Sequence, residues 1–151
     1  MKRLIANDRE RVAKWVAARV KYRGDVAGKA ALGLENEKGE LIAGILIDGY
    51  VPGARCSMHC AGEGRRWLNR EFLFACFDYV FRQLDCKVLI NAVDADNEAS
   101  LQFTQHIGFH EVCRIPEGSG DCDLVIFAMP RKMCRWLNLN GVEHVHQQTT
   151  A

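Results

Sequence analysis

The 151-residue sequence has few prolines and almost no net charge: three prolines, and +1 from twenty basic and nineteen acidic side chains. Proteins that bind nucleic acid usually carry a basic excess, so the composition gives no electrostatic reason to expect a nucleic-acid partner. No stretch approaches the roughly twenty apolar residues of a membrane-spanning helix. The N-terminal segment reaches Asp8 before any signal-peptide core could form. We therefore expect a cytoplasmic protein without a membrane anchor.

Cysteine is abundant, but its pattern does not indicate a disulfide framework or a metal site. Seven cysteines are an odd number, and in a chain without a secretion signal they favour reduced thiols. Cys56, His59 and Cys60 place three potential zinc ligands within five residues. Structural zinc sites draw on two separated ligand pairs, and no second Cys-x-x-Cys or His-x-x-x-His follows. We expect no metal.

The apolar and charged fractions, 48% and 26%, are typical of one soluble domain. We assign residues 1–138 to this domain and expect the polar segment 139–151 to be a disordered tail. Apolar periodicity predicts the order α, three strands, α, β, α, β, β. The predicted helices cover 8–20, 67–84 and 97–107, and the predicted strands cover 27–35, 40–51, 54–61, 87–93, 109–115 and 122–129. A short segment, 131–137, follows the last strand.

This order predicts a mixed α/β (α+β) sandwich in which helix 67–84 bridges a parallel pair of strands, 54–61 and 87–93. The helix is apolar around most of its circumference, which is typical of a buried central helix. Its phenylalanines and Trp67 could stack on bases or a cofactor, but their helical spacing favours core packing. The unbroken apolar run Val88–Ile90 predicts a strand covered on both faces.

A set of ordered motifs resembles the GCN5-related N-acetyltransferase family. It comprises Phe77–Leu84, the strand 87–93, Asn97–Ser100, and Gly108–Phe109 eleven residues after Asn97. The likeness is strongest over residues 40–115 and closest to the ribosomal-protein acetyltransferases and small phage-encoded members. Two short segments look like the phage type, Arg66–Leu68 and Cys134–Leu137. The resemblance implies a central mixed sheet with flanking helices, in which the parallel pair splays apart at one end.

The resemblance also implies acetyl-CoA as co-substrate, with its pyrophosphate at the loop before helix 67–84. A helix N-terminus offers unpaired amides to an anion. The family's glycine-rich motif aligns with Gly64–Asn69, where Trp67 and Asn69 fill small positions, or with His59–Gly64, which lengthens the helix; both alignments stay open. Arg65 and Arg66 either bind phosphate or are solvated. The implied cofactor-binding residues are Met58, Cys60, Ala61, Arg65, Arg66, Trp67, Leu68, Asn69 and Asn97.

Catalysis by this family needs a base for the amine and a hydrogen bond or proton for the leaving thiolate. The tyrosine that many members use is replaced by Thr104, and the resemblance assigns its task to Ser100, which could instead be a capping residue. His59 is the candidate base because its unperturbed pKa suits proton transfer near neutrality, although a lone histidine is more often structural. Asp48 and Glu63 are weaker candidates.

The resemblance implies an N-acetyltransferase that moves an acetyl group from acetyl-CoA to a primary amine by direct attack in a ternary complex. Backbone amides between Met58 and Ala61 would polarise the thioester carbonyl. The alternative is a phage-type interaction protein that keeps the fold with altered or lost CoA binding, which the filled glycine positions and the missing tyrosine motivate. The sequence does not identify the acceptor amine and leaves a homodimer open.

Overall fold

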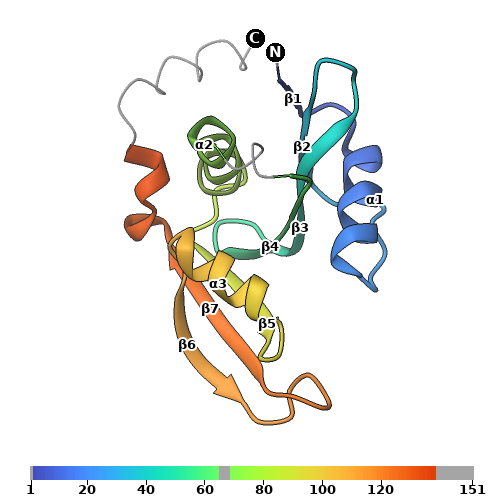
Figure 1. Ribbon diagram of the computed structural model, residues 1–151. Coiled ribbons are helices and arrows are strands. Elements are labelled where there is room, and N and C mark those ends of the chain that lie inside the picture. The colour runs from blue at the N-terminus through green and yellow to red at the C-terminus, as the bar shows by residue number, and fades with distance from the viewer. Residues whose placement is uncertain (1, 65–68, 139–151) are drawn as a thin grey trace.

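The computed structural model describes residues 2–64 and 69–138, in which seven strands form one mixed sheet (Figure 1). The strand order is β1-β2-β3-β4-β5-β7-β6, and neighbouring strands are antiparallel except for β4 and β5. The elements are β1 (Arg3–Ile5), α1 (Arg9–Val20), β2 (Ala31–Glu35), β3 (Leu41–Val51), β4 (Arg55–Gly62), α2 (Arg70–Asp78), η1 (Tyr79–Gln83), β5 (Val88–Asp94), α3 (Glu98–His106), β6 (His110–Ile115), β7 (Leu124–Pro130), η2 (Arg131–Met133) and η3 (Arg135–Asn138). The mixed α+β architecture is as predicted.

Helices cover both faces of the sheet (Figure 1). On one face, α1 packs Val12, Ala13 and Val16 against β2, β3 and β4. On the other face, α2 and the end of α3 enclose the larger apolar cluster with side chains of β3, β4, β5 and β7. The two clusters are separated by the sheet because successive strand residues point to opposite faces.

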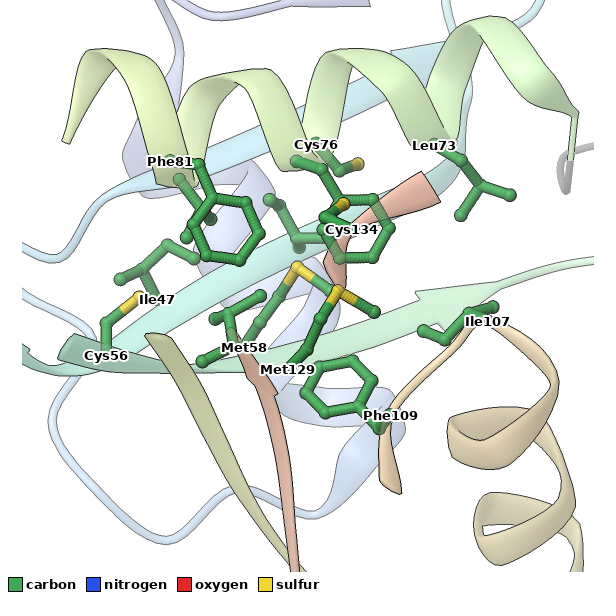
Figure 2. Close-up of a cluster of buried hydrophobic side chains, with 14 of the residues drawn as sticks. Ile47, Cys56, Met58, Leu73, Cys76, Phe81, Ile107, Phe109, Met129 and Cys134 are labelled. Atoms are coloured by element: carbon green, nitrogen blue, oxygen red, sulfur yellow. The ribbon is translucent and has the colours of Figure 1, made fainter. Parts of the chain in front are cut away.

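The larger cluster is built from sulfur-containing and aromatic side chains. Figure 2 shows Met58 of β4 and Met129 of β7 in its centre, below the helical segment that carries Cys76 and Phe81. The predicted phenylalanine stripes of this segment are buried, as core packing requires: Phe72, Phe74, Phe77 and Phe81 are at most 4% exposed. Flexible methionine side chains fill the irregular space that the rings leave.

The parallel pair β4–β5 runs side by side for a short distance and then diverges. Its register consists of Arg55 opposite Val88 and Cys56 opposite Leu89, although both strands continue beyond these positions. Past this point β5 pairs on its other edge with β7 as far as Asp94. The predicted parallel arrangement with a splayed end is therefore confirmed.

In the N-terminal half, the structure differs from the predicted strands in two ways. The structure adds β1, which sequence periodicity missed because three residues are too few to show a pattern. It also starts β2 at Ala31 rather than at residue 27, because residues 26–29 form a turn closed by the Lys29 N–H on the Val26 carbonyl. The predicted hairpin at residues 36–39 is confirmed, with Gly39 at φ +79°.

The predicted helix 67–84 is one continuous α-helix only as far as Asp78. A π-helical turn, η1, follows, and its end is marked by the Leu84 N–H bonding the Tyr79 carbonyl. The Asp78 carboxylate is buried here and accepts hydrogen bonds from Arg82 and Gln83. Burying a carboxylate without hydrogen-bond donors would be costly. Both donors to Asp78 come from the π-helical turn η1.

The prediction that both faces of Val88–Ile90 are covered is wrong. Leu89 is fully buried, whereas Val88 and Ile90 are only half-buried. The reason is that α1 packs on β2, β3 and β4, so the α1-side face of β5 lacks the cover that α2 gives the opposite face.

Candidate active site

The open end of the β4–β5 pair is held apart by a side chain instead of a backbone ladder. The Asn91 carboxamide of β5 accepts a hydrogen bond from the Met58 N–H at 2.9 Å and donates one to the Met58 carbonyl at 3.0 Å. The two polar backbone groups of Met58 that face β5 are therefore both satisfied. Its thioether side chain lies in the core, 6% exposed.

The backbone of Cys60 faces the same opening as that of Met58. Along a strand, alternate residues direct their N–H and C=O groups to the same edge. His59 and Ala61 pair with Leu46 and Gly44 of β3, so the backbone groups of Cys60 are directed toward β5. The β4–β5 register ends at Cys56, so within the described strands no β5 backbone group pairs with Cys60. Met58 and Cys60 both direct an amide into the opening, but Asn91 already binds the Met58 amide, so the Cys60 amide is the one left for a thioester.

Two helix N-termini adjoin this opening, because α2 follows β4 and α3 follows β5, and parallel strands end at the same edge of a sheet. Asn69 caps α2 by accepting from the Phe72 N–H at 2.8 Å, and Asn97 caps α3 by accepting from the Ser100 N–H at 3.2 Å. Both predicted cofactor-binding asparagines thus serve as N-caps. The remaining free amides of each first turn can meet an anion.

The position of the loop before α2 distinguishes between the two alignments of the phosphate motif. β4 extends to Gly62, which pairs with Ala43, so the alignment that starts at His59 would place most of its motif inside a strand. Gly64 lies in the loop, with φ +72° and open space around the position of a β-carbon. The predicted residues Arg65, Arg66, Trp67 and Leu68 lie outside the described residues, so their contribution stays a prediction.

His59 lies on the α1 side of β4 in a small polar cluster. Its ring is 5.1 Å from the ring of Tyr22, and its Nε2 atom is 3.9 Å from a carboxylate oxygen of Asp48, too far for a hydrogen bond. That nitrogen is buried and has no hydrogen-bond partner among the described residues. The Lys29 ammonium forms a 2.8 Å ion pair with Asp48. A neutral imidazole nitrogen without a hydrogen-bond partner keeps a free lone pair that can accept a proton.

The environment lowers the pKa of His59 below its ordinary value of about 6.5. Burial is the largest cause, since it penalises the imidazolium; Asp48 opposes it and Lys29 reinforces it. Lys29 also lowers the pKa of Asp48 by hydrogen bonding its carboxylate. The imidazole is therefore neutral near pH 7, as a general base must be, while Asp48 is a poor proton acceptor because its charge is stabilised.

Of the other candidate groups, Glu63 and Thr104 are engaged elsewhere. Glu63 is bound by Arg19 of α1 at 2.6 Å, which ties the end of β4 to the helix. Thr104, at the position of the missing tyrosine, is 5% exposed and faces the core. Ser100 is half-buried in the first turn of α3, three residues after the N-cap Asn97.

The buried thiols of the site and core are poorly reactive. All seven cysteines are free. Burial raises the pKa of Cys60 to about 12 and raises the pKa values of Cys56 and Cys86 as well. Because the thiolate is the nucleophilic form, these cysteines are unsuited to carry an acyl group. Cys60 and His59 also point to opposite faces of β4, so the zinc-like run of residues does not converge, and the described residues contain no metal-binding group of three.

Three members of this constellation were not singled out from the sequence. Asn91 is a polar residue inside an apolar strand, a signal that could have marked it. Tyr22 and Lys29 come from the connection between α1 and β2, and only the fold brings them to β3 and β4.

Across the described residues, no helix is long and apolar enough to cross a membrane.

Comparison with known proteins finds a relationship in structure alone. No protein-family model matches the sequence, and no curated protein matches it. Solved structures match at high probability. A variant of the spermidine N-acetyltransferase SpeG from Vibrio cholerae has a TM-score of 0.65 at 14% identity, over 91% of this chain and 96% of that one.

Two further solved structures show the same likeness. One is yncA from Salmonella typhimurium, a proposed acetyltransferase solved with its cofactor acetyl-CoA, with a TM-score of 0.65 at 13% identity over 86% of this chain and 94% of that one. The other is the ribosomal-protein-S18-alanine N-acetyltransferase from Escherichia coli, with a TM-score of 0.61 at 18% identity over 86% and 94%. These structures share the fold predicted from the motifs. The likeness to phage-encoded members stays a prediction.

Proposed function

From the acetyltransferase fold and the open end of the β4–β5 pair, we propose that this protein is an acetyl-CoA-dependent N-acetyltransferase that acts on a primary amine. One observation carries the proposal. The Cys60 N–H faces an opening that two helix N-termini adjoin, and the preceding residue, His59, has on the opposite face a buried Nε2 atom without a hydrogen-bond partner among the described residues. We infer that the cofactor binds from the α2 side and that the amine reaches His59 from the α1 side.

The residues present fit acetyl-CoA. The first turns of α2 and α3 would receive its phosphates, with Arg65 and Arg66 adding charge-assisted hydrogen bonds. Met58 and Ala61 would flank the bound thioester, and the Cys60 N–H would donate to its carbonyl oxygen, where negative charge develops during attack. When bound, acetyl-CoA would supply the activated acyl group, and this chain's residues would orient it and move protons.

His59 would act as the base. Its neutral Nε2 accepts a proton from the acceptor amine as the amine nitrogen bonds to the acyl carbon, and the carbon–sulfur bond then breaks to release the CoA thiolate. The Ser100 hydroxyl, in the first turn of α3, would hydrogen bond that thiolate. The high pKa of the Cys60 thiol supports direct transfer over an acyl-cysteine intermediate.

Thermal denaturation with acetyl-CoA tests cofactor binding. A ligand that binds only the folded protein adds about 2.7 kcal/mol at a hundredfold its dissociation constant, so the melting temperature should rise. No rise at millimolar acetyl-CoA would contradict the proposal and favour the interaction protein with lost CoA binding.

Incubation with labelled acetyl-CoA and a panel of amines, peptides and cell lysate tests the transfer itself. We expect label on one class of primary amine, which would identify the acceptor. Cofactor binding without transfer to any amine would contradict the assigned activity. We also propose that the protein acts in the cytoplasm, where its free thiols would stay reduced.

A further inference from the structure

Two side chains occupy the seam between β4 and β5 where the backbone ladder would continue. The Val88 N–H bonds the Ala54 carbonyl, and continuing this parallel ladder by two steps would pair the Met58 N–H with the Ile90 carbonyl. Instead the Ser57 hydroxyl donates to the Ile90 carbonyl at 2.5 Å. The Met58 N–H is bound by Asn91. Each strand therefore satisfies the other's backbone through a side chain.

The two side chains enter the seam from opposite faces of the sheet. Asn91 shares the α2 face with Leu89 and Val93, which lie two residues to either side and belong to the larger core cluster. Ser57 has the opposite orientation, because its neighbours Cys56 and Met58 point into that cluster. The side chains of Ser57 and Asn91, one from each face, lie between the two strands and fix their separation immediately before Cys60.

The carboxamide at residue 91 is suited to this position because Met58 presents a donor and an acceptor together. An asparagine side chain supplies one acceptor and two donors, so it satisfies both groups. An aspartate would keep the acceptor and lose the donor, and an alanine would lose both. Without Asn91, Met58 would be free to pair with β5, and the opening in front of Cys60 would narrow.

We propose that Asn91 is a positioning residue for acetyl-CoA: by occupying both backbone groups of Met58, it ends the β4–β5 ladder and keeps the Cys60 N–H available to the acyl carbonyl. This inference rests on the proposed function. Asn91 itself does not touch the reacting atoms; it acts through the backbone of β4. A purely structural asparagine would affect stability and leave cofactor affinity unchanged.

The test compares Asn91→Ala and the isosteric Asn91→Asp with a matched control, Asn36→Ala. Asn36 also bonds backbone groups, accepting from the N–H groups of Lys38 and Glu40, but it lies in the β2–β3 hairpin. Each folded variant is titrated with acetyl-CoA, and KM values are measured for acetyl-CoA and for the amine. We expect acetyl-CoA Kd and KM to rise about tenfold or more for both Asn91 variants, with the amine KM unchanged.

The outcomes separate the two proposals. An Asn91→Asp protein that binds acetyl-CoA as tightly as Asn36→Ala does would overturn the positioning role while the acetyltransferase function stands. Wild-type protein that does not bind acetyl-CoA would overturn the proposed function and the positioning role with it. Because Asn91→Asp preserves side-chain size, it supplies the result even if Asn91→Ala does not fold.

Discussion

The two ends of the β4–β5 pair differ in what lies between the strands. At the closed end the backbones pair directly, and Cys56, Cys86 and Leu89 are at most 1% exposed. At the open end side chains replace backbone partners, and the neighbouring groups are polar: Asn91 in the seam and His59 beside it. The same pair of strands thus provides burial at one end and unpaired hydrogen-bonding groups at the other. We expect substitutions at the closed end to change stability and substitutions at the open end to change activity.

The largest expected effect is at the open end. His59→Ala should lower kcat/KM by about a hundred- to ten-thousandfold, because it removes the proposed base. Steady-state kinetics on a variant shown to fold by circular dichroism checks this, with His110→Ala, an exposed histidine of β6, as control. Wild-type rates for His59→Ala would show that the histidine is structural.

At the closed end, Leu89→Ala should lower the free energy of unfolding by about 2–5 kcal/mol, because it leaves a cavity at a fully buried position. Urea denaturation measures this loss. Acetyl-CoA affinity of the folded variant should match wild type. A large loss of affinity with unchanged stability would reverse the assignment of roles to the two ends.

Ser100→Ala should lower kcat by about ten- to a hundredfold and leave the acetyl-CoA KM unchanged. The reason is that a hydrogen bond to the leaving thiolate forms as charge develops in the transition state. Initial-rate kinetics over a range of acetyl-CoA concentrations measures both constants. If only thermal stability changes, Ser100 serves the first turn of α3 and not the reaction.

The smallest expected effect is a shift in pH dependence. Activity requires neutral His59, so kcat/KM should rise with pH through the pKa of His59, below 6.5. Tyr22, Lys29 and Asp48 face the ring, and Lys29 is the cation that lowers its pKa. Lys29→Met removes that cation and leaves the Asp48 carboxylate without its ion pair, so the rising limb should move to higher pH. An unmoved or lowered limb would exclude this role for Lys29.

The order of the elements could be predicted because most helices and strands carry their own apolar period and end signals. Asn97 and Gly108 bound α3 as expected, with Gly108 at φ +113°. The strand β1 could not be predicted, because it forms only by pairing Arg3–Ile5 with β2. The end of α2 at Asp78 could not be predicted either, since the π-helical turn leaves no break in the apolar pattern.

The candidate site could be predicted only in part. His59 was singled out from its residue type and its place at a strand end, and the structure adds the partners that lower its pKa. Tyr22 and Lys29 reach it through tertiary packing that no local pattern encodes. Asn91 interrupts an apolar strand, yet its two bonds to Met58 depend on a parallel register that sequence alone does not define.

The most direct test of the proposed function is an NMR titration that shows which part of β4 acetyl-CoA contacts. Protein labelled with ¹⁵N at cysteine gives an amide signal for each of its seven cysteines, and Cys60→Ala and Cys56→Ala variants identify two of them. On titration with acetyl-CoA, we predict that the Cys60 signal at the open end shifts most and the Cys56 signal at the closed end stays nearly fixed. Equal shifts at both ends, or no shift at Cys60 under saturating acetyl-CoA, would contradict binding of acetyl-CoA at the open end of the β4–β5 pair.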